Sequence, residues 1–200
     1  MTRKFELLSR ETCYEGFFRL ERLHLRHSLF RGGMSPSLMR EVVERADVAA
    51  VLLYDPRLDQ VVMIEQFRVG AMADANGPWM LEIVAGMIEP GEAPEQVARR
   101  EAMEEAGCAI AALEPITTFY ATPAKSSERS YLYCGAVDAR HAAGIHGLAH
   151  EGEDIRVLPM PTDAALALLD AGAINSAWPM IALHWLARHR QRLRQAWGSI

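Results

Sequence analysis

The stretch from Gly86 to Cys108, GMIEPGEAPEQVARREAMEEAGC, constrains the fold of this chain more than any other. It begins with a turn that contains glycine and proline, and its later part has the composition of a helix. Pro94 suits the first helical turn, where its missing N–H is not needed, and Gly107 suits the residue that ends a helix. The sequence therefore predicts a tight turn followed by a helix from about Pro94 to Ala106.

Three glutamates, Glu101, Glu104 and Glu105, lie near the C-terminal end of this helix. Spacings of three and four residues place them on one side of a helix. Their like charges repel one another and also face the negative end of the helix dipole. Hard divalent cations such as Mg²⁺ bind carboxylate oxygens and would relieve this repulsion. The alternative interpretation is a solvated acidic surface neutralised by Arg99 and Arg100.

Composition limits the class of protein. The 200 residues suffice for one domain with a modest extension, and half of them are hydrophobic. The net charge of −5 argues against a nucleic-acid-binding surface. The sequence has neither an apolar signal segment nor an apolar run of roughly 20 residues, so we expect a cytoplasmic protein without a membrane partner. The widely spaced Cys13, Cys108 and Cys134 are interpreted as reduced core thiols.

Residues 1–46 predict a small antiparallel sheet that precedes a main domain over residues 47–196. Alternating apolar and polar residues indicate three strands in this segment. A sheet of this size is only marginally stable alone and needs another surface to pack on. The expected strands cover residues 4–9, 17–30 and 38–46.

Two pairs of side chains in the second of these strands are of interest. Phe17 and Phe18 are adjacent, so in a strand they would face opposite sides, and one of them would be free to stack on a ligand. His24 and His27 have no carboxylate or cysteine at ligand spacing, which indicates surface residues rather than metal ligands.

The rest of the chain consists of strands and loops and ends in two helices. A loop rich in glycine, histidine and alanine over residues 138–154 precedes the last strand. The first C-terminal helix is predicted from Thr162 until Gly172. The second is predicted from Ser176 onward, with a basic end that suits the helix dipole and is interpreted as structural. The expected strands cover residues 47–54, 60–68, 79–85, 116–120, 129–137 and 154–160.

The Gly86–Cys108 stretch resembles the Nudix box, Gx5Ex7REUxEExGU. Gly86, Glu92, Arg100 and the three glutamates fill its polar and glycine positions, whereas Ala102 stands where a larger aliphatic residue is usual. Beyond the box, the chain looks most like the bacterial ADP-ribose pyrophosphatases of the Nudix family. The stretches that carry this likeness are residues 15–18, 62–68, 78–86, 127–129 and 144–154, and Pro123, sixteen residues beyond Gly107.

This resemblance implies a fold of the α/β (α+β) class, an α/β/α sandwich around a mixed sheet with a small N-terminal antiparallel sheet. It also implies a homodimer in which the N-terminal sheet exchanges between subunits and helps build the partner's adenine site. The implied activity is Mg²⁺-dependent hydrolysis of the pyrophosphate bond of ADP-ribose to AMP and ribose 5-phosphate, with Mn²⁺ as the alternative ion.

The resemblance also implies catalytic roles for residues of the box and of the 144–154 loop. Glu104 is expected to hold a coordinated water molecule or a second ion, and Arg100 is expected to pair with the box carboxylates. The general base is implied to come from the loop, as Glu151, with the adjacent Glu153 as its rival. The implied metal ligands are Glu101, Glu105, Glu153 and the main-chain carbonyl of Ala85.

Substrate contacts are implied for six further residues. Arg40 and Arg68 match arginines that contact phosphate or ribose, a role that suits the guanidinium group. Glu128 matches a residue that binds the hydroxyls of the terminal ribose, and Phe17 is a candidate to stack on adenine. The remaining candidates, which are expected to line the site, are Glu82 and Met87.

One departure from the family pattern bears on specificity. Ala124 and Lys125 stand where the relatives usually have glycines after the marker proline, near the expected terminal-ribose end. The main alternative is therefore the same reaction on another nucleoside diphosphate sugar, such as GDP-mannose. A non-catalytic Nudix module that binds ADP-ribose is a more distant alternative, because such modules commonly lose the box glutamates that this chain retains.

Overall fold

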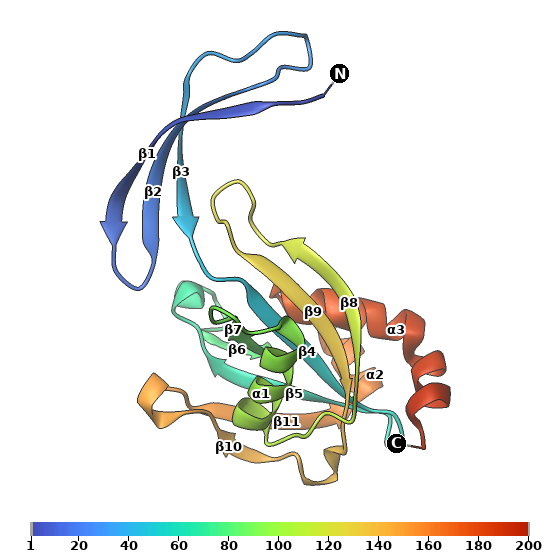
Figure 1. Cartoon of the computed structure of the whole chain (residues 1–200). Helices are drawn as coiled ribbons and strands as arrows, with labels where there is room; N and C mark the ends of the chain where they lie inside the picture. Colours follow the sequence, from blue (N-terminus) through green and yellow to red (C-terminus); the bar gives the residue numbers. More distant parts are fainter. Residues whose placement is uncertain (1, 200) are drawn as a thin grey trace. The chain divides into compact units, whose positions relative to one another are not determined.

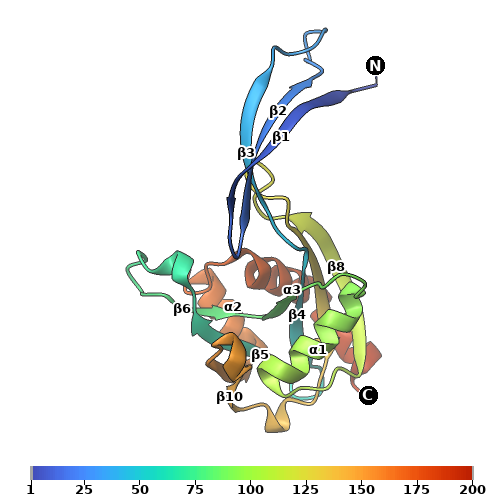
Figure 2. The ribbon, with the colours of Figure 1, turned by 60° about the vertical axis from the view of Figure 1, so that its left-hand side comes forward.

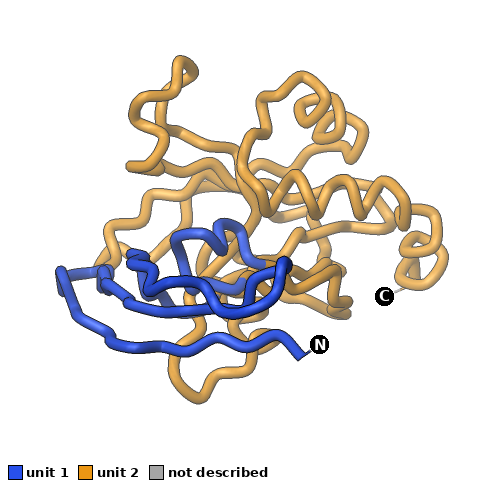
Figure 3. The backbone as a smooth tube through the Cα atoms, turned by 90° about the horizontal axis from the view of Figure 1, so that it is seen from above, with its two compact units in different colours: residues 1–47, 120–129 blue, residues 48–119, 130–200 orange. Residues whose placement is uncertain are grey.

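The computed structural model describes residues 2–199, and the chain divides into two compact units (Figures 1 and 3). Unit 1 contains the chain up to Asp47 together with Tyr120–Arg129. Unit 2 contains Val48–Phe119 and the chain from Ser130 onward. Within residues 2–199, no helix has both the length and the apolar character needed to cross a membrane.

Unit 1 is built on the predicted three-stranded antiparallel sheet, in the order β1-β2-β3. In its register Leu7 lies opposite Leu25, and Leu23 lies opposite Arg40. Every residue of β1 is exposed. The strands are β1 (Phe5–Glu15), β2 (Arg19–His27) and β3 (Leu38–Glu44).

The bend between β1 and β2 differs from the prediction. The N–H of Gly16 donates to the carbonyl of Phe18 at 3.0 Å, so β2 begins only at Arg19. The prediction that Phe17 and Phe18 face opposite sides of a strand is wrong, because side chains in a bend do not follow the alternation of a strand. Their rings instead contact each other edge to face, with centroids 4.8 Å apart.

The segment 120–129 joins unit 1 through backbone pairing with the end of β3. Val43 forms a parallel bridge with Ser126, and its carbonyl accepts the N–H of Ser127 at 3.1 Å. The guanidinium of Arg129 binds Asp47 through Nε at 2.9 Å and Nη2 at 2.6 Å. These contacts explain why residues so distant in sequence belong to one unit.

Unit 2 is organised around a mixed eight-stranded sheet in the order β10-β11-β5-β4-β9-β8, with β6 paired to β5 and β7 paired to β4. Strand β4 runs parallel to β9 and antiparallel to β5 and β7. The predicted 138–154 loop contains the short β10 and two single-turn 3₁₀ helices. The strands are β4 (Val48–Asp55), β5 (Gln60–Phe67), β6 (Trp79–Glu82), β7 (Val84–Met87), β8 (Ala112–Tyr120), β9 (Arg129–Ala136), β10 (Gly144–His146) and β11 (Ile155–Pro161).

Helices cover both faces of this sheet (Figure 2). The side chains of β4 pack into a core on each face. Val51 and Leu53 pack in the core beneath α1, whereas Leu52 and Tyr54 pack in the core beneath α2 and α3. Successive side chains of a strand point to opposite faces, so one fully buried strand supplies two cores. The predicted α/β/α sandwich is confirmed. The helices are α1 (Pro94–Ala106), α2 (Thr162–Asp170) and α3 (Ala177–Trp197).

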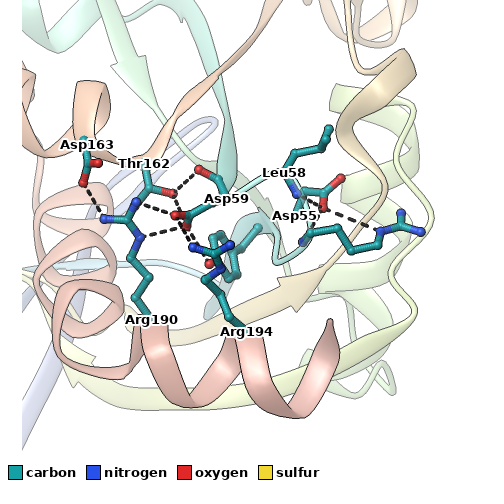
Figure 4. Close-up of polar contacts among 9 residues, drawn as sticks. Asp55, Leu58, Asp59, Thr162, Asp163, Arg190 and Arg194 are labelled. Carbon is teal, nitrogen blue, oxygen red and sulfur yellow. Dashed lines mark hydrogen bonds and ion pairs between the residues drawn. The ribbon is translucent and has the colours of Figure 1, made fainter. Parts of the chain in front are cut away.

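The basic end of α3 binds Asp59 in the turn between β4 and β5 (Figure 4). Asp59 accepts hydrogen bonds from Arg190 Nε at 2.7 Å and Arg194 Nη1 at 3.0 Å. The hydroxyl of Tyr54 donates to the same carboxylate at 2.8 Å. Thr162, the first residue of α2, donates through Oγ1 to the Asp59 carbonyl at 2.9 Å. As predicted, these arginines serve structure, and they hold α3 to the sheet.

All three cysteines are free, but they do not share one environment. Cys108 and Cys134 are buried, as predicted. The prediction of a core thiol is wrong for Cys13, which is exposed on β1, where no residue of the strand is buried.

Candidate active site

Helix α1 is fixed at both ends by local interactions. At its start, Pro94 occupies the first turn, and the side chain of Gln96 accepts the N–H of Ala93 at 3.1 Å. At its end, Gly107 adopts φ 63°, a left-handed conformation that favours glycine, and its N–H donates to the Met103 carbonyl at 3.1 Å. Because both ends of α1 are fixed, the positions of the glutamates on the helix are fixed as well.

The carboxylate of Glu101 lies directly against Gly86 in β7. A Cβ atom added to Gly86 would stand 1.7 Å from Glu101 Oε1, so a side chain at this position would displace the carboxylate. Strand β7 pairs with β4 here, with Gly86 opposite Ala49. The first glycine of the box is thus required by the close approach of a box glutamate.

Arg100 holds three box carboxylates, as predicted. Its Nη1 lies 2.7 Å from Glu101 Oε1 and 2.9 Å from Glu104 Oε2, and its Nε lies 3.4 Å from Glu92 Oε1. The N–H of Glu89 donates to Glu92 at 3.0 Å, and this bond lowers the pKa of Glu92. Arg100 therefore links the turn before α1 to the helix itself.

Glu105 is almost completely buried beneath this surface, with 2% of its area exposed. Its Oε2 accepts the N–H of Ala85 at 3.0 Å. Burial raises the pKa of Glu105 to about 8, the nearby charges of Glu101 and Glu153 add to the rise, and Arg68 opposes it.

Glu101 shares this electrostatic environment. Burial raises its pKa to about 7, with a further rise from Glu104 and Glu153 and an opposing effect from Arg100. Within residues 2–199, no three acidic, histidine or cysteine side chains already stand at the geometry of a metal site. One oxygen of Glu101 binds Arg100 and one of Glu105 binds Ala85, so the expected ligand set stays a prediction.

The two loop glutamates have different surroundings. Glu153 is partly buried, and its Oε2 accepts the N–H of Leu148 at 2.9 Å. The side chain of Glu151 is 55% exposed, and its Oε1 lies 3.6 Å from Nε2 of His150. The charge of Glu153 acts on Glu101 and Glu105, whereas Glu151 lies at the surface of the loop.

Three predicted substrate residues lie in unit 2. Arg68 follows β5 and binds Glu82 through Nε at 2.7 Å. Glu82 ends β6 with 5% of its area exposed, and Arg68 acts electrostatically on Glu105. Met87 ends β7 and is 46% exposed. These side chains lie on the strands that support the box.

The other three predicted substrate residues lie in unit 1. Phe17 is 78% exposed and lines an open cavity of about 290 Å³. Glu128 is buried, which raises its pKa, and its Oε2 pairs with Arg45 Nη1 at 2.9 Å. Arg40 is exposed on β3, and its Nη1 donates to the Met39 carbonyl at 2.7 Å.

Sequence reasoning missed Arg45. Its guanidinium lies over the ring of Phe18, 4.6 Å from the centroid, while it also pairs with Glu128. It lines the same cavity as Phe17. No motif marks this arginine, because its partners come from a bend and from a segment more than 80 residues away.

Comparison with known proteins agrees with these features. The model of the NUDIX domain family matches residues 44–181. The chain is 48% identical over 193 residues to an ADP-ribose pyrophosphatase of Escherichia coli (strain K12), covering 96% of this chain and 92% of that protein. It is 34% identical over 188 residues to a GDP-mannose pyrophosphatase of Cronobacter sakazakii, covering 93% and 96%. A solved structure of an ADP compounds hydrolase shares the fold, with a TM-score of 0.70, 21% identity and coverage of 97% and 96%.

Proposed function

The chain belongs to the NUDIX family, and we propose that it hydrolyses the pyrophosphate bond of ADP-ribose to AMP and ribose 5-phosphate. The observation that carries this proposal is the 48% identity to an ADP-ribose pyrophosphatase over nearly the full length of both proteins. The reaction adds one water molecule across the P–O–P bond, so each product carries one phosphate monoester. The carboxylates gathered on α1 support the proposal, because diphosphate hydrolysis needs cations to offset phosphate charge.

We propose that Mg²⁺, or Mn²⁺ as the alternative, is held by Glu101, Glu105, Glu153 and the carbonyl of Ala85. Glu104 is proposed to hold a coordinated water molecule or a second ion. Two observations support this proposal. Glu101 lies against Gly86 in the space that a side chain there would fill, and the charges of Glu101, Glu105 and Glu153 repel one another. The bound ion supplies positive charge that offsets the diphosphate and activates water.

Glu151 is the proposed general base. Its carboxylate is exposed and free of the backbone bond that restrains Glu153, so it is better able to reach a water molecule beside the substrate. Glu153, whose charge acts on Glu101 and Glu105, is better suited to a ligand role. The turnover of a Glu151→Gln variant distinguishes the two glutamates as the base.

Substrate contacts are proposed in both units. Arg68 is oriented by its bond to Glu82, which leaves the rest of its guanidinium for a phosphate oxygen. Phe17, through its exposed ring, is the proposed adenine stacker. The remaining proposed contacts are Arg40 with phosphate or ribose, Glu128 with the terminal ribose, and Glu82 and Met87 in the lining.

We further propose a cytoplasmic homodimer in which the N-terminal sheet helps build the partner subunit's adenine site. The exposed apolar side chains of β1, which include Phe5 at 80% and Tyr14 at 62%, support a covered surface. Free buried thiols support a reducing compartment. Light scattering on the purified chain should give twice the mass of one subunit, and a monomer at micromolar concentration would contradict the dimer.

A panel of nucleoside diphosphate sugars tests the activity. The chain is incubated with Mg²⁺ and alkaline phosphatase, which releases phosphate only from the cleaved monoester products. A strong preference for ADP-ribose is expected. A preference for GDP-mannose would favour the second candidate, which the 34%-identical relative supports. Binding of ADP-ribose without any cleavage would favour a non-catalytic module.

A further inference from the structure

The loop that carries Glu151 and Glu153 is attached to the C-terminal end of α1. The N–H of Gly147 donates to the main-chain carbonyl of Glu104 at 3.2 Å. Helix C-termini leave carbonyls without a partner inside the helix, and the loop satisfies one of them. The loop therefore contacts the same turn of α1 that carries the box glutamates.

A second contact lies beside this hydrogen bond. The ring of His146 lies over Gly107, so closely that a Cβ atom at Gly107 would stand 2.8 Å from the ring's Cε1. Nε2 of His146 lies 3.0 Å from the carbonyl of Ala143, which fixes the ring in this position. Gly107 thus meets two requirements, a left-handed φ of 63° and a bare surface for the ring.

The same loop segment fixes Glu153. Leu148 exchanges two hydrogen bonds with it: the Leu148 N–H donates to Glu153 Oε2 at 2.9 Å, and the Glu153 N–H donates to the Leu148 carbonyl at 3.3 Å. Gly147 leaves room for this arrangement, because a Cβ atom there would stand 2.6 Å from Glu153 Cβ. Gly147 also has a φ of +100°, which favours glycine.

We propose that Gly107, His146 and Gly147 form a clasp that positions Glu153 beside the glutamates of α1. The role of Glu153 in metal binding rests on the proposed function, whereas the clasp itself is a property of the fold. The three residues touch neither substrate nor reacting atoms in this proposal, so they are positioning residues. In this proposal Gly107 both ends α1 and contacts the ring of His146.

A double-substitution cycle tests the contact. His146→Ala removes the ring, Gly107→Ala pushes the ring away, and each is expected to lower kcat about tenfold or more with little change in KM. The double variant should lose no more than either single variant, because both remove one contact. If the double variant instead loses kcat by the product of the two single losses, Gly107 acts only as a helix end. An unchanged kcat in His146→Ala would overturn the clasp.

Gly172→Ala is the matched control. Gly172 follows α2 with a φ of +75°, and no atom lies within 4 Å of the position that its Cβ would occupy. This variant carries the backbone cost of alanine at positive φ without a clash, so its melting temperature should fall while kcat stays within about twofold of wild type. An equal kcat loss in Gly172→Ala and Gly107→Ala would assign the effect to helix stability and overturn the proposal.

His146→Phe separates the ring contact with Gly107 from the polar chemistry of the imidazole. The phenyl ring covers Gly107 but cannot form the bond to the Ala143 carbonyl, so kcat should recover in part, to within about threefold of wild type. Mn²⁺ affinity, measured by calorimetry without substrate, should fall about tenfold in His146→Ala and recover in His146→Phe. Failure of His146→Phe to recover either quantity would contradict a clasp based on packing.

Amide hydrogen exchange separates failure of the clasp from failure of the proposed function. In metal-free protein, residues 147–154 should exchange at least about tenfold faster in His146→Ala than in wild type, while α1 is unchanged. If wild type cleaves no ADP-ribose, the proposed function is wrong, yet this measurement still tests the clasp. If wild type cleaves ADP-ribose and His146→Ala changes neither exchange nor kcat, only the clasp is wrong.

Discussion

At the scale of single residues, Glu105 combines deep burial with a backbone partner. Its carboxylate is bound to Ala85, and burial raises its pKa to about 8. A buried carboxylate is costly unless a cation or a proton neutralises it. The cation proposed for this site would offset the cost of burying the Glu105 carboxylate.

Glu105→Gln should lose metal affinity and most activity while retaining the fold. The amide oxygen of glutamine keeps the bond to Ala85 but carries no charge, so we expect at least about a tenfold loss of Mg²⁺ affinity. Calorimetry and initial rates measure these effects. Without metal, the melting temperature above about pH 8 should not fall, because the substitution removes a buried charge there. Activity near that of wild type would mean that Glu105 is not a metal ligand.

Glu151→Gln should separate binding from turnover. A general base contributes about 10²- to 10⁴-fold to rate, so kcat should fall by that factor while Mg²⁺ and ADP-ribose still bind. The substitution leaves the partly buried Glu153 and its Leu148 bond intact. Unchanged turnover would transfer the role of base to Glu153 or to another group.

At the scale of elements, α3 is held by its buried apolar residues and, in addition, by polar contacts of two arginines with Asp59. Asp59→Asn keeps the size of the side chain, and asparagine tolerates the positive φ of 58° at this position. The substitution removes the negative charge that Arg190 and Arg194 both bind. The free energy of unfolding, measured by urea denaturation, should therefore fall by about 2 kcal/mol. The kcat should stay unchanged.

Glu114→Gln is the matched control for this prediction. It removes the charge from the more exposed pair between Glu114 and Arg192, which should cost less than about 1 kcal/mol. Equal losses in the two variants would contradict a special role for Asp59 in holding α3.

Local signals predicted the helices and most strands. Pro94 and Gly107 act through the backbone of their own turn, so α1 has the predicted bounds. The chain over Trp79–Ala85 was predicted as one strand, but it divides at the buried Ile83. The first part pairs with β5 and the second with β4, and only the neighbouring strands determine that change.

Site residues were predictable where a motif fixes their spacing. The box glutamates lie together because one helix carries them. The contact between His146 and Gly107 joins residues almost 40 positions apart, and the pair of Arg45 with Glu128 joins residues more than 80 apart. No local pattern encodes such contacts, so they became visible only in the fold.

At the scale of the whole molecule, pH should act through the carboxylates of α1. The pKa values of Glu101 and Glu105 rise from 4.5 to about 7 and about 8 on folding. Between pH 4.5 and 8 the folded chain therefore binds more protons than the unfolded chain, and its stability decreases as pH rises. The stabilisation that comes from these raised pKa values is fully present below about pH 4.5 and is lost as pH rises through 7 to 8.

The melting temperature of the chain in EDTA should accordingly fall by a few degrees between about pH 6 and pH 9. For a chain of this length, a loss of about 1 kcal/mol in the free energy of unfolding lowers the melting temperature by about 2–4 °C. Mg²⁺ should raise it more at the higher pH, because the ion binds the deprotonated carboxylates. Glu105→Gln should flatten the dependence. A melting temperature that rises with pH in EDTA would contradict the raised pKa values.

The position of β4 between early and late segments has a consequence for synthesis on the ribosome. Its parallel neighbour β9 lies about 80 residues later, and the core that holds Leu52 also contains Leu193 and Trp197. A nascent chain cannot complete this core until residues as late as Trp197 have left the ribosomal exit tunnel. We therefore expect β4 to stay without its full core until then and to need protection by chaperones.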